Sequence, residues 1–164
     1  MHQHKLPTFS ELYTEDETAW LDASVELLLL EQYHRLDFAN LREYLTDMAA
    51  RDRREVSSRL LVLLQHILKW IYQPELRSRS WATTILHQQY ELSELAGRGV
   101  LQSHACDVLG QKYRQGVQEA ALETGLSESI FPVECPLTFE QLLNYKTGEL
   151  NQSEFQPRTP VQAG

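Results

Sequence analysis

Apolar residues recur at steps of three and four along most of this chain, which is the spacing of one helix face. The first run predicts a helix over about residues 15–34, because Thr14 offers an N-cap and Glu17 the matching partner of a capping box. The segment before it, residues 1–11, is polar and carries Pro7, so we expect it to be flexible.

Two further helices are expected in the next part of the chain. Asp37 is the N-cap candidate of the second helix, which carries apolar residues on one face as far as Met48. Asp52, with Glu55 three residues later, marks the start of the third helix. Because no Gly or Pro separates the second helix from the third, one long bent helix is the alternative interpretation.

The third predicted helix has the broadest apolar face, which is typical of the central helix of a bundle. That face consists of Leu60, Leu63, Leu64, Ile67, Leu68 and Ile71. Pro74 ends the helix, because the residue before a proline is pushed out of α geometry. A fourth helix is expected from about Ser80 to the glycines at positions 97 and 99, where the helix signal stops.

The fifth predicted helix runs from about Leu101 to Gly125 and has small residues on its apolar face. Gly116 and Ala120 would let another helix approach closely, so this face is our candidate for a homodimer contact. An irregular strap over residues 127–136 follows, and then a short helix from Thr138 to Asn144.

Composition agrees with an all-α fold. The chain has 27 leucines against eight valines and four isoleucines, and leucine favours helices whereas β-branched residues favour strands. We predict a single-domain antiparallel bundle of about five helices over residues 12–144, with a C-terminal strap and short helix. The tail over residues 145–164 holds two prolines and little periodicity, so we expect it to be flexible.

The net charge of −8 is spread unevenly along the chain. Residues 1–50 carry three basic and ten acidic side chains, whereas residues 51–81 carry seven basic and three acidic ones. A basic middle between acidic flanks indicates either neighbouring helices with complementary charge or a local anion site. An acidic chain lacks the basic surface that phosphate binding needs, which argues against nucleic acid as a partner.

The segment LLVLLQHILKWIYQPELRSRSW, residues 60–81, resembles the signature of a bacterial family catalogued as domain of unknown function, number twenty-nine. The signature HxxKWxYQPExRSxSW starts at His66, and two further pieces accompany it, ETGL at residues 123–126 and FPVECP at residues 131–136. The resemblance covers about residues 12–144 and implies an almost entirely helical domain without an established activity. Tyr44 and Thr46 stand where family members are usually acidic, which weakens any role for paired carboxylates there.

The best candidate site is a second face of the third helix, together with the turn that follows it. Guanidinium groups bind carboxylate or phosphate, and tryptophan faces stack on planar groups, so this surface could bind an anion or a planar ligand. The competing interpretation is structural, with the tryptophans in the core and the cations paired inside the fold. The candidate residues are His66, Lys69, Trp70, Gln73, Arg77, Arg79 and Trp81.

Other chemistries have weaker support in the sequence. The histidines and the two cysteines form no HExxH, CxxC or similar metal motif, so we expect no metal site and no cofactor. A catalytic Cys135 would need a histidine such as His66 beside it, and the sequence gives no distance between them. A buried structural cysteine is the better interpretation of Cys135.

The absence of a catalytic motif favours a non-catalytic helical module for protein interaction or regulation. Its partner would be another protein or a second copy of the chain. The alternative is an enzyme or a protein that binds a small anion with the face around His66, Lys69 and Arg77. No apolar run approaches the roughly 20 residues of a membrane span, and we expect a soluble, cytoplasmic protein.

Overall fold

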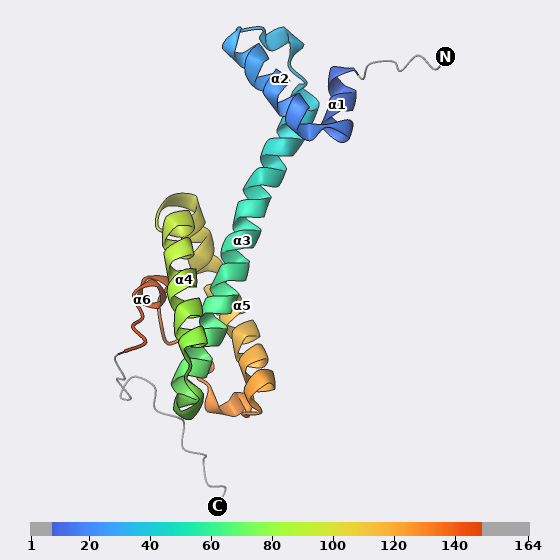
Figure 1. Cartoon of the computed structure of the whole chain (residues 1–164). Coiled ribbons are helices and arrows are strands. Elements are labelled where there is room, and N and C mark those ends of the chain that lie inside the picture. The colour runs from blue at the N-terminus through green and yellow to red at the C-terminus, as the bar shows by residue number, and fades with distance from the viewer. Residues whose placement is uncertain (1–7, 149–164) are drawn as a thin grey trace, which may run out of the picture. The chain divides into compact units, whose positions relative to one another are not determined.

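The computed structural model describes residues 8–148, and within them every regular element is a helix or a short 3-10 turn. The helices are α1 (Phe9–Glu15), α2 (Glu17–Leu29), α3 (Phe38–Tyr72), α4 (Arg79–Ala96), α5 (Gly99–Thr124) and α6 (Phe139–Leu143). Short 3-10 turns lie at Tyr33–Arg35, Pro74–Leu76 and Glu128–Ile130. The prediction of an all-α bundle is therefore confirmed (Figure 1).

The chain divides into two compact units, an N-terminal unit up to Arg51 and a C-terminal unit from Asp52 onward. The boundary between the units falls inside α3. The sequence predicts one domain over residues 12–144, a range that includes parts of both units. The second and third predicted helices are one helix, because Asp52 and Glu55 lie on exposed or half-buried turns of α3 and interrupt nothing. The alternative of one long helix was the correct one.

The N-terminal unit begins earlier than predicted. α1 starts at Phe9, inside the segment expected to be flexible, because Thr8 and Glu11 form a capping box. Thr14 is not an N-cap; its hydroxyl donates to the Glu11 carbonyl within α1. The cap of α2 is Asp16, whose carboxylate accepts from the Ala19 amide at 3.0 Å.

The core of the N-terminal unit is built around one tryptophan. Trp20 is fully buried, and the rings of Phe9, Tyr13 and Tyr44 lie 6.3, 4.8 and 5.9 Å from it. Tyr44 therefore has a packing role. Asp37 is the predicted cap of α3, and its carboxylate accepts from the Asn40 amide at 3.3 Å and from the Ser10 hydroxyl at 2.7 Å.

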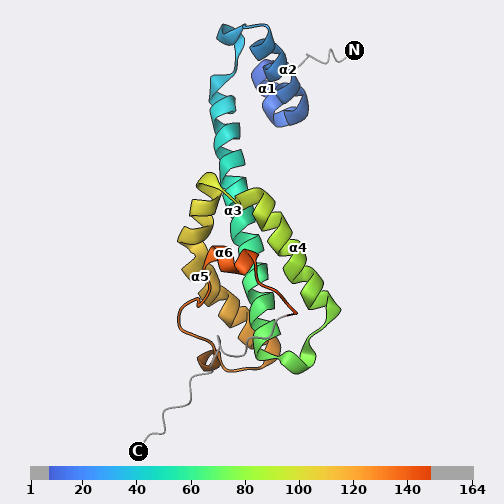
Figure 2. The same ribbon diagram turned by 90° about the vertical axis from the view of Figure 1, so that its left-hand side faces the viewer.

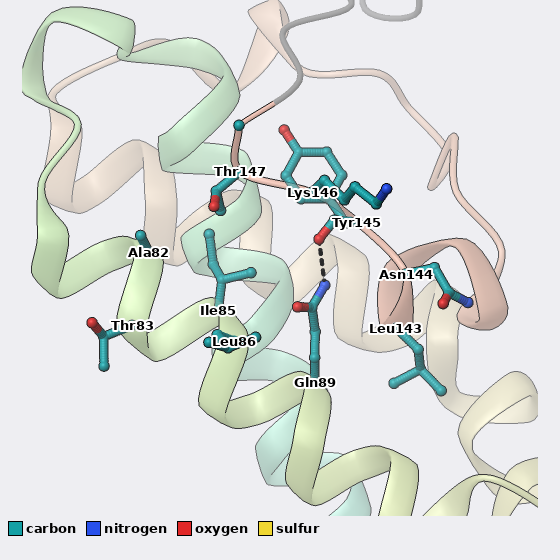
Figure 3. A pocket seen from close by; sticks show the side chains of 11 residues that line it. Ala82, Thr83, Ile85, Leu86, Gln89, Leu143, Asn144, Tyr145, Lys146 and Thr147 are labelled. Carbon is teal, nitrogen blue, oxygen red and sulfur yellow. Dashed lines mark hydrogen bonds between the residues drawn. The ribbon is translucent and has the colours of Figure 1, made fainter.

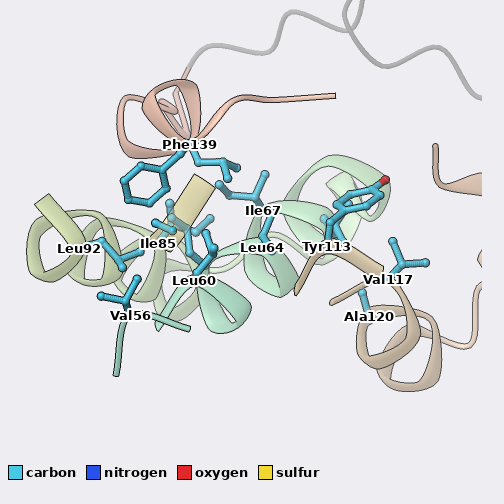
Figure 4. Close-up of a cluster of buried hydrophobic side chains, with 14 of the residues drawn as sticks. Val56, Leu60, Leu64, Ile67, Ile85, Leu92, Tyr113, Val117, Ala120 and Phe139 are labelled. Atoms are coloured by element: carbon cyan, nitrogen blue, oxygen red, sulfur yellow. The ribbon is translucent and has the colours of Figure 1, made fainter. Parts of the chain in front are cut away.

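In the C-terminal unit, α4 and α5 lie beside the C-terminal half of α3, and α6 crosses between them (Figures 1 and 2). The leucine face of α3 is the centre of the core, as predicted (Figure 4). Leu60 and Leu63 are fully buried, and Phe139 reaches the same cluster from α6. Gln89 on α4 holds the end of α6 by donating to the carbonyls of Leu142 and Tyr145.

The small-residue face of α5 is used inside the chain. A Cβ placed on Gly116 would lie 3.4 Å from Leu64 Cβ and 3.6 Å from the Gln65 nitrogen, both on α3. Ala120, one turn later, is fully buried. The predicted homodimer contact through this face is therefore wrong, because α3 of the same chain already occupies it.

The end of α5 follows the prediction, because Gly125 caps it in the left-handed conformation with φ of 72°. The capping box of Thr138 and Gln141 starts α6 as expected. Of the tail predicted to be flexible, Tyr145 is bonded by Gln89, and residues 149–164 lie outside the described residues.

Candidate functional site

The signature residues at the end of α3 meet the end of α5 around one buried lysine. The Lys69 side chain is only 7% exposed, and its Nζ lies 2.7 Å from Glu123 Oε2, whose side chain is 50% exposed. Gln65 donates to the other carboxylate oxygen of Glu123 at 2.5 Å. The Lys69 ammonium also lies 5.1 Å from the centre of the Trp81 ring on α4. One cation thus connects three helices.

Electrostatics at this cluster follow from the geometry. The hydrogen bond from Lys69 holds the pKa of Glu123 below its usual value, and the Lys69 charge and the Gln65 amide act in the same direction. Burial lowers the pKa of His66, and the Lys69 charge adds to that effect. His66 Nδ1 lies 2.9 Å from the Val62 carbonyl, so the imidazole is anchored to its own helix.

Two more signature residues bind backbone carbonyls near the turn after α3. Arg77 Nε donates to the Trp70 carbonyl at 2.7 Å, and its guanidinium lies 5.1 Å from the centre of the Trp70 ring. Gln73 donates to the Thr124 carbonyl at 3.3 Å, across to α5. Arg77 therefore satisfies a carbonyl in the last turn of α3 and Gln73 one at the end of α5, where helix carbonyls lack intrahelical partners.

The FPVECP segment is tied to the same end of the unit. Phe131 is buried, with its ring 4.6 Å from the ring of Tyr72 in an edge-to-face arrangement. Tyr113 on α5 donates to the Pro132 carbonyl at 2.8 Å. Cys135 Sγ donates to the Leu137 carbonyl at 3.2 Å. This segment therefore packs the strap against α3 and α5.

The structure brings most of the predicted site residues into internal contacts. Lys69 and Trp81 meet each other, Arg77 stacks on Trp70, and Gln73 reaches α5. Arg79 differs, since it is exposed at the first position of α4, whose N-cap is Ser78. Glu123 and Gln65 complete the cluster, and the helical spacing of the sequence does not single them out. Glu123 is the first residue of the ETGL piece of the resemblance.

Two surface hollows lie elsewhere in the C-terminal unit. The larger, of about 710 Å³, is formed by α4 and the segment after α6 (Figure 3). Its floor is apolar, with Ile85, Leu86 and Leu143, and its polar Gln89 is already bonded to Tyr145. The smaller, of about 410 Å³, lies between α5 and the strap. Neither hollow is lined by a residue of the predicted site.

Among residues 8–148, the cysteines and histidines show no catalytic arrangement. Burial raises the pKa of the Cys135 thiol, which disfavours the thiolate that a nucleophile needs. A pairing that the sequence did not reveal joins His104 Nε2 to Ser57 Oγ at 3.0 Å, and the same nitrogen lies 3.1 Å from the Arg53 carbonyl. A nitrogen that donates to a carbonyl cannot accept the serine proton, so this contact ties α5 to α3.

Over residues 8–148, no helix combines the length and the apolar character needed to cross a membrane. In the same range, no three His, Cys, Asp or Glu side chains gather closely enough to hold a metal ion.

Large apolar side chains are exposed in both units, and within the described residues the shorter N-terminal unit has seven of them against six in the C-terminal unit. We call the seven in the N-terminal unit the exposed apolar set; they are Val25, Leu28, Leu29, Leu30, Tyr33, Phe38 and Leu45. Five of them fall within residues 28–38, which run from the last turn of α2 through the connection to the first residue of α3. Contiguous apolar surface of this kind is one feature of protein interaction sites.

A strained turn holds part of this set in place. Glu31 has φ of 57°, although it is not glycine, and it ends α2 in the left-handed conformation. The Gln32 amide donates to the Leu27 carbonyl at 2.9 Å and the Glu31 amide to the Leu28 carbonyl at 3.1 Å. This pair of bonds is a Schellman motif, which fixes the direction in which the chain leaves the helix.

Comparison with known proteins identifies the family. The family model described as "Domain of unknown function DUF29" matches residues 12–147, which is most of the chain. Searches of curated proteins and of solved structures found no match.

Proposed function

The chain belongs to the DUF29 family, and from that premise we propose that it is a non-catalytic helical module that binds another protein through its N-terminal unit. The observation that carries this proposal is the exposed apolar set. Leu29 is 79% exposed and Phe38 is 61% exposed, although both sit in a unit that buries few large side chains. A partner that covers them would remove this apolar surface from water.

The two faces of α2 support this interpretation. Trp20, Ser24 and Leu27 point into the unit, at steps of four and three. Val25 and Leu29, also spaced by four, lie on the outer side and are more than half exposed. A helix that is apolar on both faces is normally buried on both. The outer face of α2 therefore lacks a partner within the described residues.

The contacts of the signature residues argue against the alternative of an anion-binding face. A binding site needs cations that are available to the ligand, and of the three predicted ones Lys69 is paired with Glu123, Arg77 donates Nε to the Trp70 carbonyl, and only Arg79 is exposed. Lys69 and Arg77 stabilise the packing of the C-terminal unit. We assign recognition to the N-terminal unit for this reason.

The cytoplasm is the compartment that we propose. Cys106 and Cys135 are both free thiols, and Cys106 is exposed. Free exposed cysteines are typical of proteins kept in a reducing compartment.

Quantitative affinity capture tests the function. Wild type, a Leu29→Ser/Tyr33→Ser double variant and a Leu122→Ser control are incubated with a lysate of the cells that encode the chain. Leu122 is 86% exposed on α5, so the control removes an equally exposed apolar side chain from the other unit. We expect at least one protein to be retained by wild type and control and lost with the double variant. If no protein shows that pattern, the proposal is wrong.

A further inference from the structure

We propose that the partner presents an amphipathic helix whose apolar face is bordered by Lys and Arg side chains. This inference rests on the proposed function and adds the chemical class of the partner. It combines the apolar geometry of the N-terminal unit with its charge.

The apolar geometry fits a helical ligand. Val25, Leu28 and Leu29 follow helical spacing on α2, and Phe38 and Leu45 lie seven residues apart at the start of α3. The three residues on α2 form one apolar row on a single helix, which can pack against the apolar face of another helix. The partner would contribute residues at steps of three and four.

The charge of the unit selects the flanks of that helix. Of the 23 acidic side chains in the chain, ten lie in residues 1–50, together with only three Lys or Arg. Negative charge is also felt at Tyr13, which packs on Trp20: burial raises the pKa of its hydroxyl, and Glu43, Asp47 and Glu17 raise it further. A strongly acidic surface attracts basic partners and repels acidic ones.

The same charge argues against a second copy of this chain as the occupant. Two N-terminal units brought together through the exposed apolar set would both carry the acidic excess of residues 1–50. Like charges across an interface oppose association, particularly at low ionic strength. The small-residue face of α5, the other route to a dimer, is closed by α3.

Two designed peptides test the inference on the full chain. Both are labelled helices of about 18 residues, or roughly five turns, with the same leucine face. One carries Lys and the other Glu at every polar position. Fluorescence anisotropy is measured with wild type, the Leu29→Ser/Tyr33→Ser variant and the Leu122→Ser control.

We expect the Lys peptide to bind wild type and control, and to bind the double variant about tenfold more weakly or worse. The Glu peptide should bind at least about tenfold more weakly than the Lys peptide at low salt, and the difference should shrink as salt screens the charges. Equal binding of the two peptides overturns the assignment of a basic partner. Binding of the Lys peptide that ignores the double substitution overturns the assignment of the surface.

These failures are distinct from a failure of the proposed function. If affinity capture identifies a partner that depends on Leu29 and Tyr33 while neither peptide binds, the module binds protein but not a basic helix. Sedimentation velocity over a range of concentrations gives the remaining outcome. A dimer that forms with wild type and control but not with the double variant would show that a second copy covers this surface, and would overturn the inference.

Discussion

Removing the carboxylate of the Lys69–Glu123 pair should destabilise the protein more than removing the lysine. In a Glu123→Gln variant, the Lys69 side chain, which is 7% exposed, keeps its charge beside Trp81 without a negative partner. Breaking a fully buried pair in this way costs about 3–5 kcal/mol, and an exposed pair is worth about 0–1 kcal/mol. Because the Glu123 side chain is 50% exposed, solvent screens the pair, and we expect a loss of about 1–2 kcal/mol.

The reverse substitution, Lys69→Met, leaves no buried charge. Glu123 keeps its access to water and its bond from Gln65, and the methionine fills the volume of the lysine stem. Replacing a buried charge by an apolar side chain of similar size is often neutral, and here only the contact of the cation with Trp81 is lost, at about 0.5–1 kcal/mol. Lys69→Met should therefore stay within about 1 kcal/mol of wild type.

Urea unfolding followed by far-UV circular dichroism measures both free energies. The pKa of Glu123 is held below its unfolded value of 4.5, so the stability that ionised Glu123 supplies is complete above that value. It is lost as the pH falls through the lower folded-state pKa. The gap between wild type and Glu123→Gln should therefore narrow in that acid range. Equal losses for the two variants at pH 7, or a larger loss for Lys69→Met, would refute the reasoning.

Four further predictions address other parts of the structure. Gly116→Ala should be tolerated, whereas Gly116→Leu should lower the free energy of unfolding by about 1–3 kcal/mol, because only the larger side chain must displace α3. Urea unfolding measures both variants. His66 has a folded-state pKa below 6.5, so wild type should lose stability as the pH falls from that value, and His66→Gln should lose less over the same range. Tyr113→Phe removes the bond to the Pro132 carbonyl and should cost about 1 kcal/mol, with faster amide exchange in the strap. Glu31→Gly relieves the left-handed strain and should raise the melting temperature, by an amount equivalent to about 1 kcal/mol.

Helix positions in the C-terminal unit could be predicted because their signals are local. Pro74 stops α3, Gly125 caps α5, and Thr138 with Gln141 starts α6, and each effect depends only on a few neighbouring residues. Start signals failed where a polar residue fits equally well inside a helix. Asp52 with Glu55 resembles a capping box, yet on α3 both side chains can reach solvent from a continuous helix.

The candidate site was harder to predict because its partners are distant in sequence. Lys69 and Glu123 are 54 residues apart, and the Ser57–His104 contact joins residues 47 apart. Helical spacing places His66, Lys69 and Trp70 along one helix, but it does not say whether the lysine faces solvent or another helix. The relative exposure of the two partners decides between a ligand site and an internal pair, and exposure is a tertiary property.

The second part of the basic segment of residues 51–81 has a structural role. In this part, which carries the family signature, Lys69 is paired with Glu123 and Arg77 donates to the Trp70 carbonyl. The signature is therefore explained by the packing of the C-terminal unit, so it need not mark a binding site. Most of the acidic excess of residues 1–50 lies in the same unit as the exposed apolar set, and within residues 8–51 the structure gives it no ion pair. The proposed recognition therefore uses the part of the chain outside the signature, where apolar contact and negative charge would act on the same partner.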